Sequence, residues 1–509
     1  MTNPLFDALF ASNADRLTPF LISSAGDTIS YREFVESAAR MARLLVDHGL
    51  KPGDRLALQV RKSPQALMVY AACVQTGVVF LPLNTDYPPA DVAYFLADSS
   101  ASMIVCDPAR AEEISAIAAR TGARTETLAA DGSGSLTQMA RTLPVLTRAE
   151  PRQDDDLVAL LYTSGTTGRS KGAMLSQRNL LSNARTLEAF WAFSGDDVLL
   201  HALPIFHTHG LFVATNTALL SGSAMIFLSK FDVEKVIQSL PHATTMMGVP
   251  TFYTRLLAEK RFTRDLVQNM RLFVSGSAPL LPETHRAFKD RTGHDILERY
   301  GMTETNMNTS NPYKGDRRAG TVGHALPGVE LKVTDPSTGS HLPQGQIGQI
   351  EVRGPNVFQG YWKMPEKTAA ELRDNGFFVT GDLGKIDEDG YVHIVGRDKD
   401  LIISGGYNIY PKEIELLLDA QNGVLESAVI GVPHADFGET VVALVVAEAS
   451  VRPNLDEIAS VLRGTLARFK HPQKILLVDE LPRNAMGKVQ KNVLRERYRD
   501  ILTAAGDTV

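Results

Sequence analysis

Apolar residues recur along this chain with two spacings, one typical of amphipathic helices and one typical of buried strands. Across residues 31–46, apolar side chains return every three or four positions and Gly49 follows, which predicts a helix with a glycine stop. Short continuous apolar runs bounded by Gly, Pro or Asp predict strands instead. The run 157–161 is one of these, and it leads directly into a loop rich in glycine and hydroxyl side chains.

Strands and helices are predicted to alternate through the first 275 residues. After the first helix come a strand at 55–60, a helix at 64–76 and a strand at 78–82. Further strands are predicted at 103–106, 198–201, 224–227 and 272–275. This alternation predicts an α/β fold with doubly wound sheets.

From about Gly320 the pattern becomes rich in strands, at 330–333, 348–352 and 391–395, separated by Gly, Pro and Asp turns. A boundary is predicted near residue 396, and the remainder has the size of a small α+β domain. We therefore expect a large N-terminal domain, residues 1–396, with a β-rich subdomain, and a small C-terminal domain, residues 397–509.

Composition and charge exclude several classes of protein. A chain of 509 residues exceeds the size of a single core, which agrees with two domains. A net charge of −6 gives no reason to expect nucleic acid or an anionic membrane as a partner. There is no uninterrupted apolar run of 18 residues and no signal peptide, so no membrane span is expected. Cys73 and Cys106 lie in apolar segments, which predicts buried thiols in a reducing, cytoplasmic compartment.

The loop after the strand 157–161 carries the strongest chemical signal. Glycines let backbone N–H groups turn toward an anion, and hydroxyl groups add donors, so the loop suits a polyphosphate. Its spacing is not that of the P-loop NTPases, and a plain flexible surface loop is the alternative. The residues concerned are Thr163, Ser164, Gly165, Thr166, Thr167, Gly168 and Lys171.

The same order of residues resembles the phosphate-binding signature of the AMP-forming acyl-CoA synthetases, members of the adenylate-forming superfamily. Matching segments run from about residue 31 to residue 491. The resemblance is closest to the malonyl-CoA synthetases, on the wording of residues 201–210 (His-Ala-Leu-Pro-Ile-Phe-His-Thr-His-Gly), 248–255 and 298–310. It implies a small C-terminal domain that rotates between two half-reactions.

On the nucleotide side, Tyr300 can supply a flat face for adenine, and Glu304 with Thr163 can supply oxygen ligands for Mg²⁺. By the resemblance, Asp382 binds the ribose and Arg397 makes a second ribose or phosphate contact. A turn carboxylate is the plain alternative for Asp382. The other residues assigned to ATP or AMP in this way are Ser277, Ala278, Glu298, Arg299, Gly301, Met302 and Thr303.

On the acyl side, the resemblance places His207 in the acyl channel, with Ser277, Gly301 and Met302 close by. A zinc site at His207 and His209 is disfavoured, because no third ligand stands nearby in the sequence. A dicarboxylate keeps a second negative charge that must be paired when buried. Arg255, after a strand end turning into a helix, is the expected partner, and a solvated helix arginine is the alternative.

In the C-terminal domain the resemblance assigns the adenylation lysine to Lys488, whose ammonium would stabilise charge developing on the α-phosphate. It assigns the hinge to Lys399. It assigns the CoA-facing loop to Ser404, Gly405, Gly406 and Tyr407. It further suggests reversible acetylation of Lys488, with a lysine acetyltransferase and a deacetylase as partners.

The sequence therefore predicts a malonate–CoA ligase that uses ATP, Mg²⁺ and CoA, forms a malonyl-adenylate and releases AMP and pyrophosphate. Methylmalonate is an additional expected substrate. A short- or medium-chain fatty acyl-CoA ligase of the same family is the alternative. A carrier-dependent adenylation domain is disfavoured because no carrier motif follows, and a non-catalytic regulator because Glu304 and Lys488 are both present.

Overall fold

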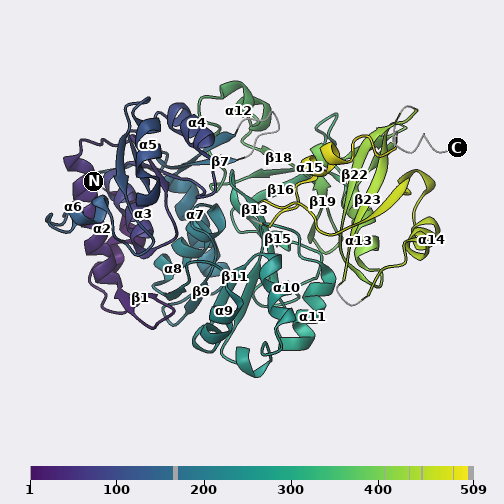
Figure 1. Cartoon of the computed structure of the whole chain (residues 1–509), viewed down its shortest axis with the longest axis horizontal. Helices are drawn as coiled ribbons and strands as arrows, with labels where there is room; N and C mark the ends of the chain where they lie inside the picture. Colours follow the sequence, from purple (N-terminus) through teal and green to yellow (C-terminus); the bar gives the residue numbers. More distant parts are fainter. Residues whose placement is uncertain are drawn as a thin grey trace.

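A computed structural model describes residues 2–163, 170–405, 407–434, 436–448, 451–484 and 487–502, and these fold into four β-sheets flanked by helices (Figure 1). The N-terminal half lies at one end of the molecule and the last sheet at the other. The two ends meet beside the strands that carry most of the predicted site.

The first sheet has six strands in the order β6-β5-β3-β4-β7-β8, all parallel except the β7–β8 pair. A predicted phosphate-binding segment joins its last two strands, since β7 ends at Thr163 and β8 begins at Lys171. The strands are β3 (Arg55–Gln59), β4 (Val79–Pro82), β5 (Met103–Cys106), β6 (Arg124–Thr127), β7 (Leu157–Thr163) and β8 (Lys171–Ser176).

The second sheet has nine strands in the order β15-β14-β13-β12-β11-β9-β10-β1-β2. Its centre, from β13 to β1, is parallel, and the strands at both edges are antiparallel. The strands are β1 (Pro19–Ile22), β2 (Thr28–Ser30), β9 (Val198–His201), β10 (Ala224–Phe227), β11 (Thr245–Gly248), β12 (Leu272–Ser275), β13 (Leu297–Met302), β14 (Asn306–Ser310) and β15 (His324–Ala325).

Helices buried between these two sheets hold them together. One hydrophobic cluster contains side chains of both sheets together with α2 (Tyr31–Asp47), α3 (Pro64–Thr76) and α7 (Gln177–Phe190). Ala66 to Thr76 of α3 are all buried, which explains why this helix is apolar all round rather than amphipathic.

The third sheet is antiparallel, with the order β16-β17-β18-β19: β16 (Glu330–Thr334), β17 (Gly348–Arg353), β18 (Phe378–Ile386) and β19 (Val392–Arg397). Asp382 on β18 stands directly opposite Arg397 on β19, so the register of this sheet sets the distance between two predicted nucleotide ligands.

The fourth sheet contains β20 (Ile402–Ser404), β21 (Tyr407–Ile409), β22 (Val424–His434), β23 (Gly438–Ala447) and β24 (Lys474–Val478). It has two hydrophobic clusters of its own and carries α13 (Pro411–Asp419), α14 (Leu455–Thr465) and α15 (Lys491–Arg497). Lys491, at the start of α15, donates to the buried carboxylate of Glu415 on α13. Glu415 also accepts from the Val429 N–H of β22 at 2.9 Å, so the segment just after Lys488 is fixed to this sheet.

The predicted fold class is confirmed, and the predicted helices and strands are found with ends that differ by at most two residues. Cys73 and Cys106 are both buried and unpaired, as predicted. Among the described helices, none combines the length and the apolar character needed to cross a membrane.

A half-buried ion pair fixes the loop before β9 to the start of β12. Arg271 binds Asp197 through two nitrogen–oxygen contacts of 2.7 Å each, and Thr244 donates to the same carboxylate at 2.7 Å. Burial raises the pKa of Asp197, but these hydrogen bonds outweigh it and hold the pKa below its usual value.

Asp197→Asn should lower the free energy of unfolding by about 2–4 kcal/mol, because Arg271 loses its counter-charge in a partly buried site. Since the folded pKa is depressed, this stabilisation is present above the unfolded pKa and is lost as the pH falls through the folded value. Denaturant titrations at pH 7 and pH 3 measure both effects.

Glu234→Gln is the matched control, because the Arg261–Glu234 pair has the same two-contact geometry but is exposed. It should change stability by at most about 1 kcal/mol. Equal losses in the two variants would contradict a special role for the buried pair.

Candidate active site

The ribose end of the site is built around the carboxylate of Asp382, which is buried on β18. Arg397 Nε lies 2.9 Å from one oxygen, and the Tyr300 hydroxyl donates to the other at 2.5 Å. The Asp382 charge also raises the pKa of Arg397. The structure thus brings these three predicted residues together and fixes the carboxylate before any sugar arrives.

The phosphate end lies between β7, β8 and α12 (Pro365–Glu371). Thr163 Oγ1 is 3.5 Å from Glu304 Oε1, and the Lys171 ammonium lies 4.2 Å from the centre of the Tyr361 ring. Burial raises the pKa of Glu304, so this carboxylate gains from a cation. Thr163 and Glu304 therefore fit Mg²⁺, whose chemistry there would be to neutralise phosphate charge. Ser164, Gly165, Thr166, Thr167 and Gly168 lie outside the described residues.

The acyl end begins at the loop after β9, which leads into a π-helix at His209–Ala214. The His209 backbone N–H donates to His207 Nδ1 at 3.3 Å, so the His207 Nε2 carries the ring proton. Burial, followed by the charges of Arg299 and Lys488, lowers the pKa of His207 to about 4. His207 is thus a neutral hydrogen-bond donor at pH 7.

Arg299 on β13 is a buried cation at this end of the site, only 3% exposed. Its Nε and Nη2 have no hydrogen-bond partner among the described residues. Burial lowers the pKa of Arg299, but a guanidinium remains charged at pH 7. Its charge acts on both His207 and His209, which shows that these groups face one another.

Gly276, after β12, gives Arg299 its space. A Cβ at this position would overlap the guanidinium of Arg299. The neighbouring residue Ser277 adopts φ +70°, and its Oγ lies 3.2 Å from His209 Nδ1. A tight turn without a side chain therefore lets the arginine approach the strand end.

Further polar groups line the same region without partners in the described part of the chain. They include His209 Nε2, Ser275 Oγ and Asn306 Nδ2. Buried polar groups are normally hydrogen-bonded, so a cluster of unsatisfied ones indicates a polar ligand.

The structure does not bring Arg255 into this cluster, which corrects the expected carboxylate partner. Arg255 lies on the exposed side of α10 (Pro250–Ala258), one turn after Thr251. The sequence assigned Arg299 to the nucleotide, whereas its guanidinium lies beside the acyl-channel histidines. A charged residue at a buried strand position was the signal available in the sequence.

The other predicted nucleotide residues lie around β13 and the β12 turn. Ala278, Gly301 and Met302 are partly exposed there, and Thr303 is buried. Glu298 is buried, accepts from the Leu280 N–H at 3.0 Å, and has its pKa raised to about 8 by burial. Glu298 therefore supports the Leu280 turn.

Lys488 reaches the site from the fourth sheet. Gly487, with φ +74°, lies close to Thr251 of α10. Burial, followed by the nearby charge of Arg397, lowers the pKa of Lys488 to about 8, while Asp382 opposes this change. The ammonium thus lies between the ribose end and His207.

The predicted CoA-facing residues lie elsewhere in this arrangement. Ser404 is buried, Gly405 follows β20 with φ +56°, and Gly406 lies outside the described residues. Tyr407 is 58% exposed, and its ring stacks on Phe469 with 4.6 Å between ring centres. Lys399 lies on a short 3₁₀ turn, Asp398–Asp400, between the third and fourth sheets.

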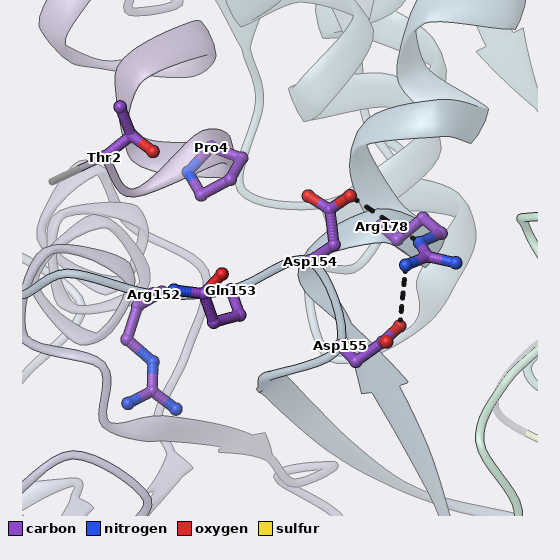
Figure 2. A pocket seen from close by; sticks show the side chains of 7 residues that line it. All are labelled: Thr2, Pro4, Arg152, Gln153, Asp154, Asp155 and Arg178. Carbon is purple, nitrogen blue, oxygen red and sulfur yellow. Dashed lines mark ion pairs between the residues drawn. The ribbon is translucent and has the colours of Figure 1, made fainter.

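A separate polar hollow lies beside the N-terminal segment (Figure 2). Arg178 there is paired with Asp154 at 3.8 Å and with Asp155 at 3.2 Å, and all three side chains are largely exposed. The predicted solvated acidic loop is confirmed, and its charges are balanced without a ligand.

Residues 11–362 match the AMP-binding enzyme family, and residues 413–488 match the AMP-binding enzyme C-terminal domain. The chain belongs to the AMP-binding enzymes. Among relatives of this AMP-binding enzyme, the malonate–CoA ligase of Arabidopsis thaliana is 32% identical over 97% of this chain and 88% of its own length. A feruloyl-CoA synthase of an Amycolatopsis species is 36% identical over 94% of this chain and 95% of its own.

The crystal structure of ATP-bound MatB from Rhodopseudomonas palustris is 58% identical to this AMP-binding enzyme and superposes with a TM-score of 0.96. The apo form of MatB gives a TM-score of 0.86. Both comparisons cover 98% of this chain and 100% of that one. The present arrangement is therefore more similar to the ATP-bound form.

Asp382→Asn should weaken Mg-ATP binding about 10- to 100-fold, because hydrogen bonds from ribose hydroxyls to a charged acceptor are stronger than those to an amide. Isothermal titration calorimetry measures this directly. Asp387→Asn is the control: Asp387 follows the same strand but pairs with His393 at 2.9 Å. Unchanged ATP affinity in Asp382→Asn would remove Asp382 from the nucleotide site.

Proposed function

We propose that this protein is a malonate–CoA ligase. One malonate carboxylate attacks the α-phosphate of ATP, which expels pyrophosphate and leaves malonyl-adenylate. The CoA thiol then attacks the acyl carbonyl, which forms malonyl-CoA and expels AMP. The observation that carries the proposal is the buried Arg299 guanidinium, which has unsatisfied donors beside His207.

A dicarboxylic acid explains this arrangement, and a fatty acid does not. The second carboxylate of malonate would pair with Arg299 through two N–H donors, a geometry that suits a planar guanidinium. An alkyl chain would leave Arg299, Ser275 and Asn306 buried without partners, at a cost for each group. The fatty acyl alternative is therefore not favoured.

The relatives support the same conclusion. MatB, a malonyl-CoA synthetase, is 58% identical over nearly the whole chain, and a malonate–CoA ligase is among the more distant relatives. Identities in the thirties do not decide the acid, because a feruloyl-CoA synthase is equally close at that level.

The described side chains suggest how the first step is catalysed. Asp382 and Tyr300 would hold the sugar and base, and Lys171 would meet the outgoing pyrophosphate. Lys488 would neutralise charge developing on the α-phosphate. The neutral His207 would donate to the reacting carboxylate and fix its direction of attack.

We further propose that the chain divides at residues 396–397 and that the C-terminal part rotates at Lys399 after the first step. Lys488 reaches the ATP site in the present arrangement, whereas Tyr407 is exposed to solvent. Rotation would exchange them and bring Ser404, Gly405 and Tyr407 toward the nucleotide for thioester formation.

A cytoplasmic location is proposed on the two buried, unpaired cysteines. Acetylation of Lys488 by a lysine acetyltransferase would remove the charge required for the first step, and a deacetylase would restore it.

Wild-type enzyme should release pyrophosphate with malonate faster than with acetate, propionate or butyrate, and methylmalonate should be a poorer substrate than malonate. Arg299→Gln should lower kcat/KM for malonate by about 2–5 kcal/mol of transition-state binding, the penalty for stranding a buried charge. Its activity with propionate should change far less, since propionate carries no second charge.

Arg255→Gln is the matched control, because Arg255 is exposed on the helix that borders the site, and it should leave the malonate rate unchanged. A wild type that prefers butyrate would refute the malonate proposal. Equal losses on malonate and propionate in Arg299→Gln would refute the role of Arg299.

Malonate-dependent ATP–pyrophosphate exchange should fall as the pH rises through about 8, because the free enzyme then loses the Lys488 ammonium. Lys488→Arg should remove this alkaline limb, since a guanidinium stays charged. Lys488→Ala should abolish exchange yet still convert supplied malonyl-adenylate to malonyl-CoA. A wild-type profile that stays flat to pH 10 would contradict this assignment.

A further inference from the structure

Glu371 is a carboxylate that the first reaction step does not use, yet it lies at the phosphate end of the site. It is the last residue of α12, and its side chain is 22% exposed. A negative charge at the C-terminal end of a helix opposes the helix dipole. Its position must therefore be stabilised by other groups.

Three groups supply that stabilisation. Lys367 Nζ lies 2.5 Å from one Glu371 oxygen. The other oxygen accepts from the Tyr361 hydroxyl at 2.7 Å and pairs with Lys171 Nζ at 3.7 Å. Two of these partners, Tyr361 and Lys171, belong to the phosphate end of the site.

Tyr361 connects Glu371 to the Mg²⁺ side. Its hydroxyl lies 3.0 Å from Glu304 Oε1, and the Lys171 ammonium lies over its ring. Figure 1 shows α12 next to β7 and β18, so the contact brings together segments about 200 residues apart in the sequence.

We propose that Glu371 is a positioning residue that holds Lys171 when no phosphate is bound and competes with pyrophosphate for it. Lys171 is buried, so it meets either the carboxylate or the phosphate anion with little screening by solvent. Because Glu371 keeps its negative charge close to the leaving pyrophosphate, it weakens pyrophosphate binding and favours its release. The role of the site in pyrophosphate release rests on the proposed adenylate-forming function.

Glu371→Gln tests this inference, because glutamine keeps the size and the acceptor for Tyr361 but removes the charge. We expect the variant to bind Mg-pyrophosphate about three- to tenfold more tightly, the scale of one partly screened charge pair. Calorimetry without any acid substrate measures the affinity, and product inhibition of the forward reaction by pyrophosphate should strengthen by the same factor.

Two variants serve as controls. Glu366→Gln removes an exposed carboxylate from the same helix and should leave pyrophosphate affinity unchanged. Glu371→Asp keeps the charge and should restore most of the wild-type affinity. In a Lys171→Gln background, Glu371→Gln should have no effect, because the competition acts through Lys171.

Equal or weaker pyrophosphate binding in Glu371→Gln, at an unchanged melting temperature, would overturn the inference. An effect that persists without Lys171 would also overturn it, since Glu371 would then repel pyrophosphate directly. A wild type that binds pyrophosphate but forms no adenylate from any acid would refute the proposed function, and the calorimetric comparison would still decide the role of Glu371 in binding.

Discussion

The whole site depends on the shared layer of buried helices that holds the two large sheets together. Because α2, α3 and α7 pack against both sheets, their strands cannot shift independently. The carboxyl ends of parallel strands meet at one edge of a sheet, where ligands of α/β proteins usually bind. His207, Ser277 and Arg299 reach one another because β9, β12 and β13 belong to the same sheet.

The electrostatics of the site are those of a protein waiting for anions. Arg299 at the acyl end and Lys488 in the middle are cations whose pKa values burial lowers, so each becomes more stable when a substrate anion arrives. Asp382 and Glu371, by contrast, have cationic or hydroxyl partners in the protein itself. The free energy spent on burying the unpaired cations is recovered as binding selectivity for charged substrates.

The fold and much of the site could be predicted from the sequence, because their signals are local. Apolar periodicity gave the helices and strands, and the residues of the ribose end lie in short, specific motifs. The carboxylate partner could not be predicted in the same way. Arg255 and Arg299 both follow apolar segments, and only the packing shows that α10 turns the first outward while β13 turns the second into the core. Glu371 was missed because a long chain segment separates it from Lys171, and no local pattern encodes their meeting.

The empty side-chain position at Gly276 has an evolutionary consequence. Any side chain there would displace the guanidinium of Arg299, and loss of that arginine would leave a cavity beside a residue unable to fill it. The two positions are thus expected to show epistasis, with each substitution harmful alone and tolerated only with the other. Descendants of this enzyme that adopt uncharged acids would have to cross that barrier, which keeps the preference for a second charge in place over long lineages.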